Sequence, residues 1–158
     1  SAGETLVAAK IAQLAGQGLP FAQVVAETDR YIGEMNTLFV LENLDTLRKA
    51  GRLTKTQALI TGALRVKLVM GSTPEGEIRK HTQALSIKQA LSKLTDLMVQ
   101  DDRHHGKMLC ISHCLCRDRA EYLRMLVRKN CDFSEIMITE TRGISTFYAN
   151  SGGIIAAY

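Results

Sequence analysis

The chain has 158 residues, of which 46% are hydrophobic, and its 20 Lys and Arg residues exceed its 16 Asp and Glu residues to give a formal charge of +4. This length suits a single domain that can bury a core without cross-links, and the mild charge excess identifies no class of partner by itself. No apolar run reaches the roughly 18 residues of a membrane span, and no segment resembles a signal peptide, so we expect a cytoplasmic domain.

Two helices are predicted at the start of the chain. From Ala2 to Gln17 apolar residues recur at helical spacing, and glycines follow at the end of the segment. A second helix begins near Phe21 and carries its apolar residues on one face, the pattern of a helix that packs one side on a core. Residues 37–41 then form a continuous apolar run, which predicts a strand buried on both faces.

Two more helices are predicted after this strand. Asn43 or Asp45 can cap a short helix that Gly51 ends. Thr54 can cap a longer helix over 55–64 that is apolar on more than one side. Such a helix is either deeply buried or lines an apolar cavity.

The second half of the chain is expected to build most of a sheet. Ser86 caps an amphipathic helix, and Asp118 begins another that runs to Asn130. The loop at 101–106 contains two Asp and two His residues, and we interpret it as solvated. The expected strands cover 66–70, 77–84, 108–112, 133–139 and 154–158.

This order of elements mixes a hairpin with helical crossovers. We therefore predict the α/β (α+β) class, with a mixed, largely antiparallel sheet flanked by helices. A glycine turn at 150–153 followed by an apolar strand should tie the end of the chain into that sheet. The sequence contains no phosphate loop, no nucleophile beside an evident base and no paired carboxylates, so residue patterns alone point to no catalytic site.

The cysteines suggest one alternative function. Three of the four lie in the segment 110–116, where neighbouring strand residues point to opposite faces, and this favours free thiols over disulfides. His113, Cys114, Cys116 and Cys131 suggest a zinc or redox site, but the paired C-x2-C spacing of zinc ligands is missing. We therefore expect no metal.

A basic surface suggests another alternative. Arg117, Arg124 and Arg128 share one helix face, and Arg79 and Lys80 lie on a predicted strand. Such a surface can dock on nucleic acid, on an anionic membrane or on a protein, although a solvated helix face is the commoner explanation. Aromatic residues make up only 5% of the chain and Trp is absent, which disfavours a nucleic-acid partner.

Three segments together resemble a known family. Residues 39–55, Ile111–His113 and Tyr148–Gly153 are similar to the C-terminal domain of the DegV family of bacterial fatty-acid-binding proteins. The resemblance covers essentially the whole chain, in order. Its most specific part is 44–55, where the family has a leucine-rich short helix that ends in Gly-Gly-Arg-Ile/Leu-Ser. It implies that residues 1–158 are the C-terminal lipid-binding domain of a two-domain protein whose N-terminal domain is absent.

The resemblance also implies a function. In this family a long-chain fatty acid lies in an apolar tunnel of the C-terminal domain, with its carboxylate near the interdomain cleft. Members of the fatty acid kinase B type present that carboxylate to a separate kinase. The chain is therefore expected to be a carrier and not an enzyme, with fatty acid as its ligand and no cofactor. Its expected partners are the kinase catalytic subunit and, transiently, an anionic membrane.

The resemblance assigns residues to the ligand site. Arg52 falls on the Arg of the family's Gly-Arg pair, and the tunnel-lining helix falls on 55–64. Tyr148 replaces the His of the motif Gly-x-His-x-Gly-Pro-Gly, so it can donate a hydrogen bond to a carboxylate but brings no charge. Leu85 replaces an Arg that approaches the carboxylate, a loss that should weaken head-group binding or shift it to the missing domain. The implied ligand-binding residues are Arg52, Leu59, Ile60, Ala63, Leu85, Thr146, Tyr148, Asn150 and Gly152.

Overall fold

The computed structural model of the chain describes residues 1–53 and 66–158. Within these residues the chain forms a six-stranded sheet with the strand order β3-β2-β1-β6-β4-β5. The predicted helix over 55–64, with Leu59, Ile60 and Ala63, lies outside the described residues. The strands are β1 (Thr37–Val40), β2 (Lys67–Ser72), β3 (Ile78–Ala84), β4 (Met108–His113), β5 (Glu135–Glu140) and β6 (Ile154–Ala157).

Most strand pairs in this sheet are antiparallel. The pairs β3–β2, β2–β1, β1–β6 and β6–β4 all run in opposite directions. Only β4 and β5 are parallel, because helix α6 (Arg117–Asn130) provides the crossover that a parallel pair requires. The prediction of a mixed, largely antiparallel sheet is therefore confirmed.

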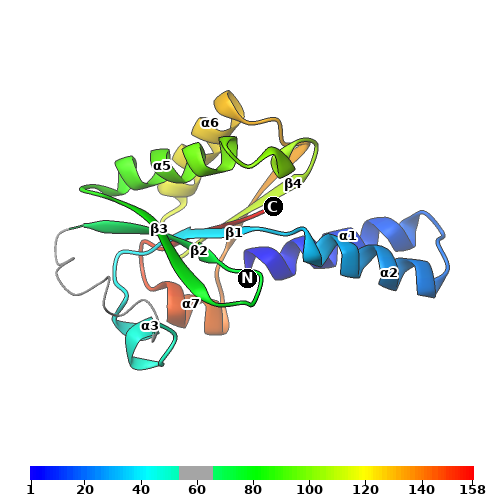
Figure 1. Cartoon of the computed structure of the whole chain (residues 1–158), viewed down its shortest axis with the longest axis horizontal. Helices are drawn as coiled ribbons and strands as arrows, with labels where there is room; N and C mark the ends of the chain where they lie inside the picture. The colour runs from blue at the N-terminus through cyan, green and yellow to red at the C-terminus, as the bar shows by residue number, and fades with distance from the viewer. Residues whose placement is uncertain (54–65) are drawn as a thin grey trace.

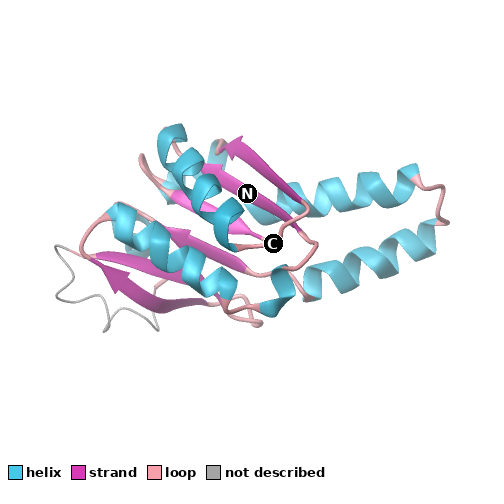
Figure 2. Ribbon diagram, turned by 90° about the horizontal axis from the view of Figure 1, so that it is seen from above, coloured by secondary structure: helices cyan, strands magenta, loops and turns pink. Residues whose placement is uncertain are grey.

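The helices are distributed unequally over the two faces of the sheet (Figure 1). Helices α5 (Ile87–Val99) and α6 cover one face, while the short helices α3 (Asp45–Lys49) and α7 (Gly143–Ala149) lie on the other. Helices α1 (Ala2–Gly16) and α2 (Phe21–Gly33) form a pair that projects beyond the sheet (Figure 2). The sequence predicted neither α7 nor the 3-10 turn η1 (Asp102–His104).

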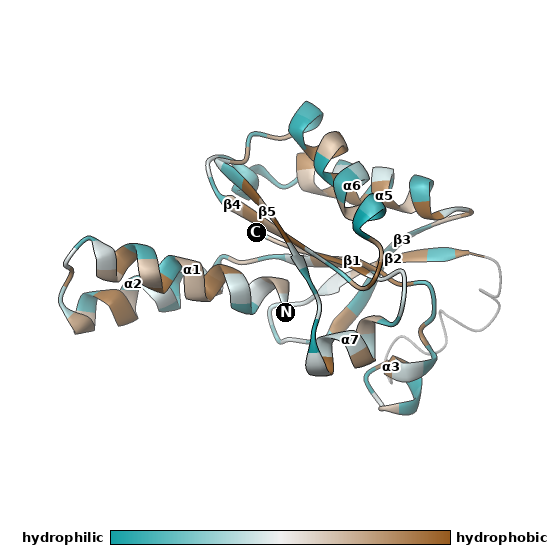
Figure 3. Cartoon of the chain, turned by 180° about the vertical axis from the view of Figure 1, so that it is seen from behind, coloured by the Kyte–Doolittle hydropathy of each residue, from teal (hydrophilic) through white to brown (hydrophobic). Residues whose placement is uncertain are grey.

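The main core lies between the sheet and the α5–α6 layer. Alternate residues of the strands point to this side, as Leu38 and Val40 do from β1, and both are buried. They meet Leu91 and Leu94 of α5 and Leu123 of α6, which are also buried. Figure 3 shows brown, apolar residues along central strands such as β1 and β4. Burying each such side chain contributes about 1.5–3 kcal/mol, so this layer supplies much of the stability.

Among residues 1–53 and 66–158, the opposite face of the sheet is less completely covered. Phe39 and Ile155 point to this side and are only half-buried, although Met70 and Leu68 of β2 are buried there. The prediction that residues 37–41 are buried on both faces is therefore only partly right. The open space beside Phe39 is the reason, and it becomes the cavity described below.

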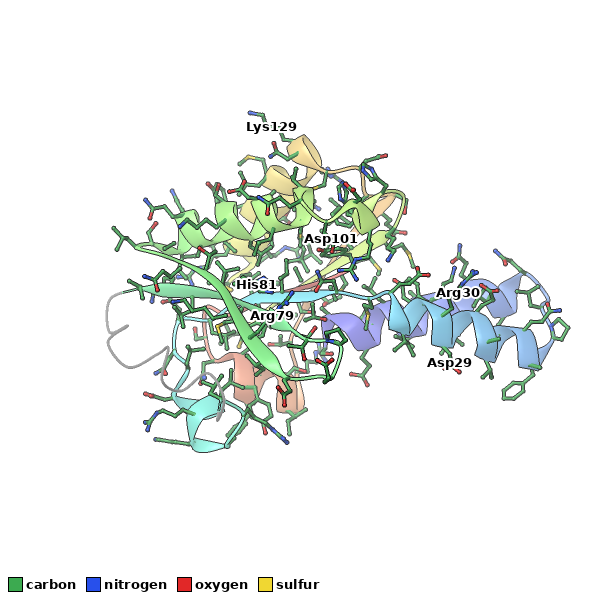
Figure 4. All side chains as sticks on the ribbon, viewed as in Figure 1. Asp29, Arg30, Arg79, His81, Asp101 and Lys129 are labelled. Atoms are coloured by element: carbon green, nitrogen blue, oxygen red, sulfur yellow. The ribbon has the colours of Figure 1, made fainter. Side chains whose placement is uncertain are left out.

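The end of the chain is fixed to the sheet, as its apolar sequence predicts. The side chain of Tyr158 is 1% exposed, and its hydroxyl donates a 2.9 Å hydrogen bond to Oδ2 of Asp101 (Figure 4 labels Asp101). Asn36 donates from Nδ2 to both groups, and Arg103 forms an ion pair with Asp101. Burial would raise the pKa of Asp101, but these hydrogen bonds outweigh it and hold that pKa far below its ordinary value.

The loop at 101–106 is less solvated than its composition predicts. His104 is only 3% exposed, and its ring packs 5.5 Å from the ring of Phe133. Its Nδ1 lies 2.7 Å from the backbone carbonyl oxygen of Asp101. The prediction of a solvated loop is therefore wrong for His104, because the aromatic ring finds both an apolar neighbour and a hydrogen-bond partner inside the fold.

Candidate functional site

A cavity of about 310 Å³ lies on the less covered face of the sheet, between β1, β6, α3 and α7. Most of the lining atoms of the described residues are apolar, and a few hydroxyl groups and the guanidinium group of Arg52 accompany them. Such a combination is typical of pockets that bind small molecules. The lining residues are Ser1, Phe39, Leu41, Leu47, Arg52, Ile78, Ser112, Thr141, Ser145, Tyr148, Ala149 and Ile155.

The strands form the floor of the cavity. Phe39 of β1 and Ile155 of β6 are directly opposite each other in the antiparallel register. Their neighbours Leu38 and Ala156 point to the main core on the other face, because successive strand residues alternate. Ser112 belongs to this floor too, since it pairs with Ile155 across β4 and β6.

Two short helical segments form the walls. In α7, Ser145, Tyr148 and Ala149 all face the cavity, because residues three and four positions apart share a helix face. Leu47 of α3 faces it from the other wall. The chain leaves α3 through Gly51, whose φ of +70° is in the region that favours glycine, and Arg52 follows beside the cavity.

Several hydroxyl groups lie in the cavity lining or bond to it. Ser112 Oγ lies 2.8 Å from Thr139 Oγ1, so β4 and β5 join their side chains at this point. Thr146 donates a 3.0 Å hydrogen bond to the hydroxyl of Thr141. Ser145 lines the cavity at the same end of α7. These groups can donate to or accept from a polar ligand atom, while Arg52 supplies the positive charge.

The turn after α7 holds the end of that helix. Asn150 has a φ of +54°, and its Nδ2 donates a 3.1 Å hydrogen bond to the hydroxyl of Thr46 in α3. Gly152 has a φ of +88°, and its backbone N–H donates to the carbonyl oxygen of Cys114 at 2.8 Å. The two walls of the cavity are thus connected by Asn150 and Thr46, and the turn is fixed to the end of β4.

The residues that the family resemblance assigns to the site occupy different places. Arg52 and Tyr148 line the cavity. Thr146 does not line it but bonds to the lining residue Thr141, while Asn150 and Gly152 bond to Thr46 and Cys114 outside the lining. Leu85 does not line it. Its side chain is 76% exposed and lies in a separate groove between β3 and α5.

The sequence reasoning missed the hydroxyl groups of Ser112, Thr141 and Ser145, and it missed the apolar floor residues Phe39 and Ile155 as ligand contacts. One local signal was present. Ser112 is a polar residue inside an apolar strand, and a polar group on the buried face of a strand needs a partner or a ligand. The other residues come from three separate segments, around Phe39, around Thr141 and Ser145, and around Ile155, so no local pattern connects them.

The structure also places residues of the alternative hypotheses. Arg117 and Arg124 both form ion pairs with Glu121, which neutralises part of the basic face of α6. Figure 4 places Lys129 near the outer end of this helix, and α6 lies on the face of the sheet opposite to the cavity.

In the described part of the chain, no three His, Cys, Asp or Glu side chains are grouped to hold a metal ion. Among residues 1–53 and 66–158, no helix has the length and apolar character needed to cross a membrane.

A sheet with its main core on one face, and with an apolar cavity and polar groups on the other, defines an α/β domain of the kind that can hold a small amphipathic molecule. Comparison with known proteins identifies which such domain this is. The family model described as "Uncharacterised protein, DegV family" matches residues 1–157. The chain therefore belongs to the DegV family, as its sequence resemblance indicated.

Several bacterial relatives share this fold. A crystal structure of a DegV family protein from Ruminococcus gnavus, described with vaccenic acid, has a TM-score of 0.91 and 44% identity over 98% of this chain and 55% of that one. The fatty acid kinase (Fak) B3 protein of Streptococcus pneumoniae, loaded with linoleic acid, has a TM-score of 0.88 and 27% identity over 99% of this chain and 56% of its own. A DegV domain-containing protein from Streptococcus gordonii is 29% identical over 97% of this chain and 54% of its own length. The chain thus spans about half the length of the relatives it matches.

Proposed function

We propose that the chain binds one long-chain fatty acid, with the acyl chain in the cavity between the sheet, α3 and α7. The cavity is the observation that carries this proposal. Its apolar floor and walls, including Phe39, Leu47 and Ile155, would remove methylene groups from water. Each buried methylene contributes about 0.8 kcal/mol. The fatty acids bound by the relatives from R. gnavus and S. pneumoniae support the same ligand class.

The polar groups of the lining would interact with the carboxylate. Arg52 provides a positive charge, and Tyr148 provides a hydroxyl donor on the opposite wall. A hydrogen bond to a charged group contributes about 1.5–3 kcal/mol. Thr146, Asn150 and Gly152 act indirectly, since they hold the turn and helix that carry Tyr148. Leu85 is not part of this proposed site, because it lies in another groove.

We further propose that residues 1–158 are the C-terminal domain of a two-domain protein. The chain spans 55% of its R. gnavus relative and 56% of its S. pneumoniae relative, which supports a second domain of similar size. Ile144 and Phe147 of α7 are 72% and 60% exposed, although both are large and apolar. A neighbouring domain would cover this face of α7 and complete the surroundings of the carboxylate.

The function that follows is a cytoplasmic carrier and not an enzyme. A fatty acid kinase subunit would act on the presented carboxylate, and the similarity to the Fak B3 protein supports such a partner. Lipid would enter and leave by transient contact with an anionic membrane. In this proposal the chain carries the fatty acid, and the kinase subunit catalyses the reaction at its carboxylate.

Lipid extraction tests the proposal. The chain purified from a bacterial cytosol should release long-chain fatty acid on extraction, identified by mass spectrometry, at close to one molecule per chain. After delipidation it should take up added oleate to the same ratio. A preparation that contains no fatty acid and does not take up oleate would contradict the proposal.

A further inference from the structure

A charged cluster lies behind the turn that ends the cavity wall. Glu42, just after β1, accepts a hydrogen bond from Lys67 of β2 and forms an ion pair with Arg119 of α6 through Oε1 and Nη1 at 2.7 Å. The same Nη1 donates a 2.9 Å hydrogen bond to the carbonyl oxygen of Gly152. One guanidinium nitrogen thus connects α6, the end of β1 and the turn before β6. We call Arg119 and Glu42 the clamp.

The clamp is partly shielded from water. The side chains of Arg119 and Glu42 are 28% and 29% exposed. Burial would raise the pKa of Glu42, but the hydrogen bonds from Lys67 and Arg119 outweigh it and lower that pKa. Glu42 therefore keeps its negative charge and holds the guanidinium group in a fixed place.

The turn fits closely against the clamp. A Cβ atom at Gly152 would lie 2.7 Å from Arg119 Nη1 and 2.7 Å from Glu42 Cγ. A Cβ atom at Gly153 would lie 2.5 Å from the carbonyl oxygen of Ala149. The two glycines of the turn are therefore required by close contacts on both sides, in addition to the positive φ of Gly152.

This turn connects two surfaces of the cavity. It follows Tyr148 and Ala149, which belong to the wall, and precedes Ile155, which belongs to the floor. A displacement of the turn would therefore move both surfaces relative to each other. The buried residues that pack α6 onto the core include Ala120, Leu123 and Val127.

We infer that Arg119, held by Glu42, is a positioning residue for the fatty-acid cavity. It acts through the turn at 150–153, because its hydrogen bond goes to Gly152, which is not among the residues that line the cavity. The inference rests on the proposed function for its ligand readout, but the ordering of the turn can be measured without a ligand. Neither the sequence motifs nor the helix packing identifies this role.

Hydrogen exchange of the 158-residue chain tests the inference first. In Arg119→Met, the amides of Gly152 and Gly153 should exchange about tenfold faster or more, the scale expected for losing a hydrogen bond with a charged donor. The amides of β1 and β2 should keep their rates. Arg119→Lys should restore part of the protection, because an ammonium group can also donate to two acceptors. Arg124→Met is the matched control, since Arg124 is on the same helix but pairs with Glu121, and it should leave the turn unchanged.

Oleate dissociation from the same variants is the second readout. It should be about three- to tenfold faster in Arg119→Met and close to wild type in Arg124→Met, a loss of the size of one charge-assisted hydrogen bond acting indirectly. Unchanged exchange in Arg119→Met, or faster exchange throughout the sheet, would overturn the inference. Faster exchange at the turn of Arg119→Met with an unchanged rate of oleate dissociation would also overturn the inference, but it would leave the proposed function intact. If the wild-type chain binds no oleate, the proposed function fails, while the exchange rates still decide whether Arg119 orders the turn.

Discussion

Replacing Ala149 with leucine should close part of the cavity and weaken fatty-acid binding without unfolding the chain. Ala149 is the last residue of α7, is 3% exposed and faces the cavity across from the sheet. A longer side chain at this position would extend into space that the acyl chain is proposed to occupy. The surrounding residues Leu41 and Tyr148 are compatible with an apolar side chain.

The size of the effect follows from the displaced methylenes. Leucine adds about three carbon atoms, so roughly three methylenes of the ligand would lose their place, at about 0.8 kcal/mol each. The sum of ~2.4 kcal/mol corresponds to a roughly 60-fold increase in the dissociation constant. Extra methylenes in a packed core cost about 1–3 kcal/mol, and the cavity beside Ala149 offers space for them, so the free energy of unfolding should fall by no more than ~3 kcal/mol.

Titration with oleate, followed by isothermal calorimetry, measures the first quantity, and urea unfolding measures the second. Leu85→Ala serves as the control, because Leu85 is exposed in the groove between β3 and α5 and should not change oleate affinity. Equal affinities for wild type and Ala149→Leu would refute the assignment of the cavity. A larger loss in Leu85→Ala than in Ala149→Leu would move the site to the other groove.

Three further predictions concern the head group, the turn and the end of the chain. Arg52→Met should weaken oleate binding by roughly 10- to 100-fold, the range for one charge-assisted hydrogen bond, while binding of oleate methyl ester, which carries no charge, stays the same in a parallel titration. Gly152→Ala should lower the free energy of unfolding by about 1–3 kcal/mol in urea, and Arg119→Met should recover part of this loss because it removes the atom that the new Cβ meets. Tyr158→Phe should lower the free energy of unfolding by about 1.5–3 kcal/mol at neutral pH. It should also make that free energy depend less steeply on pH in the acidic range. The reason is that the folded-state pKa of Asp101 lies below its ordinary value of 3.8, so the stability it contributes is complete above this value and is lost as the pH falls further. Thermal unfolding between neutral and acidic pH measures both effects. If the pH dependence of stability in the acidic range were the same in wild type and Tyr158→Phe, the role of Asp101 would be contradicted.

The sheet could be predicted because its strands carry their own local signals. Apolar runs such as 108–113 and 154–157 are bounded by turns, and they became β4 and β6 at nearly the predicted positions. Helix α7 could not be predicted in this way. It has only seven residues, Ile144 and Thr146 are β-branched, and no side chain caps its start, so tertiary packing of Tyr148 and Ala149 must stabilise it.

The site was predictable only in part. The family resemblance assigned Arg52 and Tyr148 to the ligand site from their positions in family motifs, and both residues line the cavity. It placed Leu85 by the same reasoning, but β3 ends at Ala84, which is buried, and the alternation of the strand turns Leu85 outward. Ser112 bonds to Thr139 only because β4 and β5 pair in parallel, a long-range contact that no local pattern of the sequence contains.

A crystal structure of the chain with a long-chain fatty acid brominated at its terminal carbon would test the central claim most directly. The account predicts one anomalous peak for bromine inside the cavity, between α7 and the floor formed by Phe39 and Ile155, and continuous density from there toward Arg52. Bromine in the groove beside Leu85, or no bound fatty acid at saturating concentration, would contradict it.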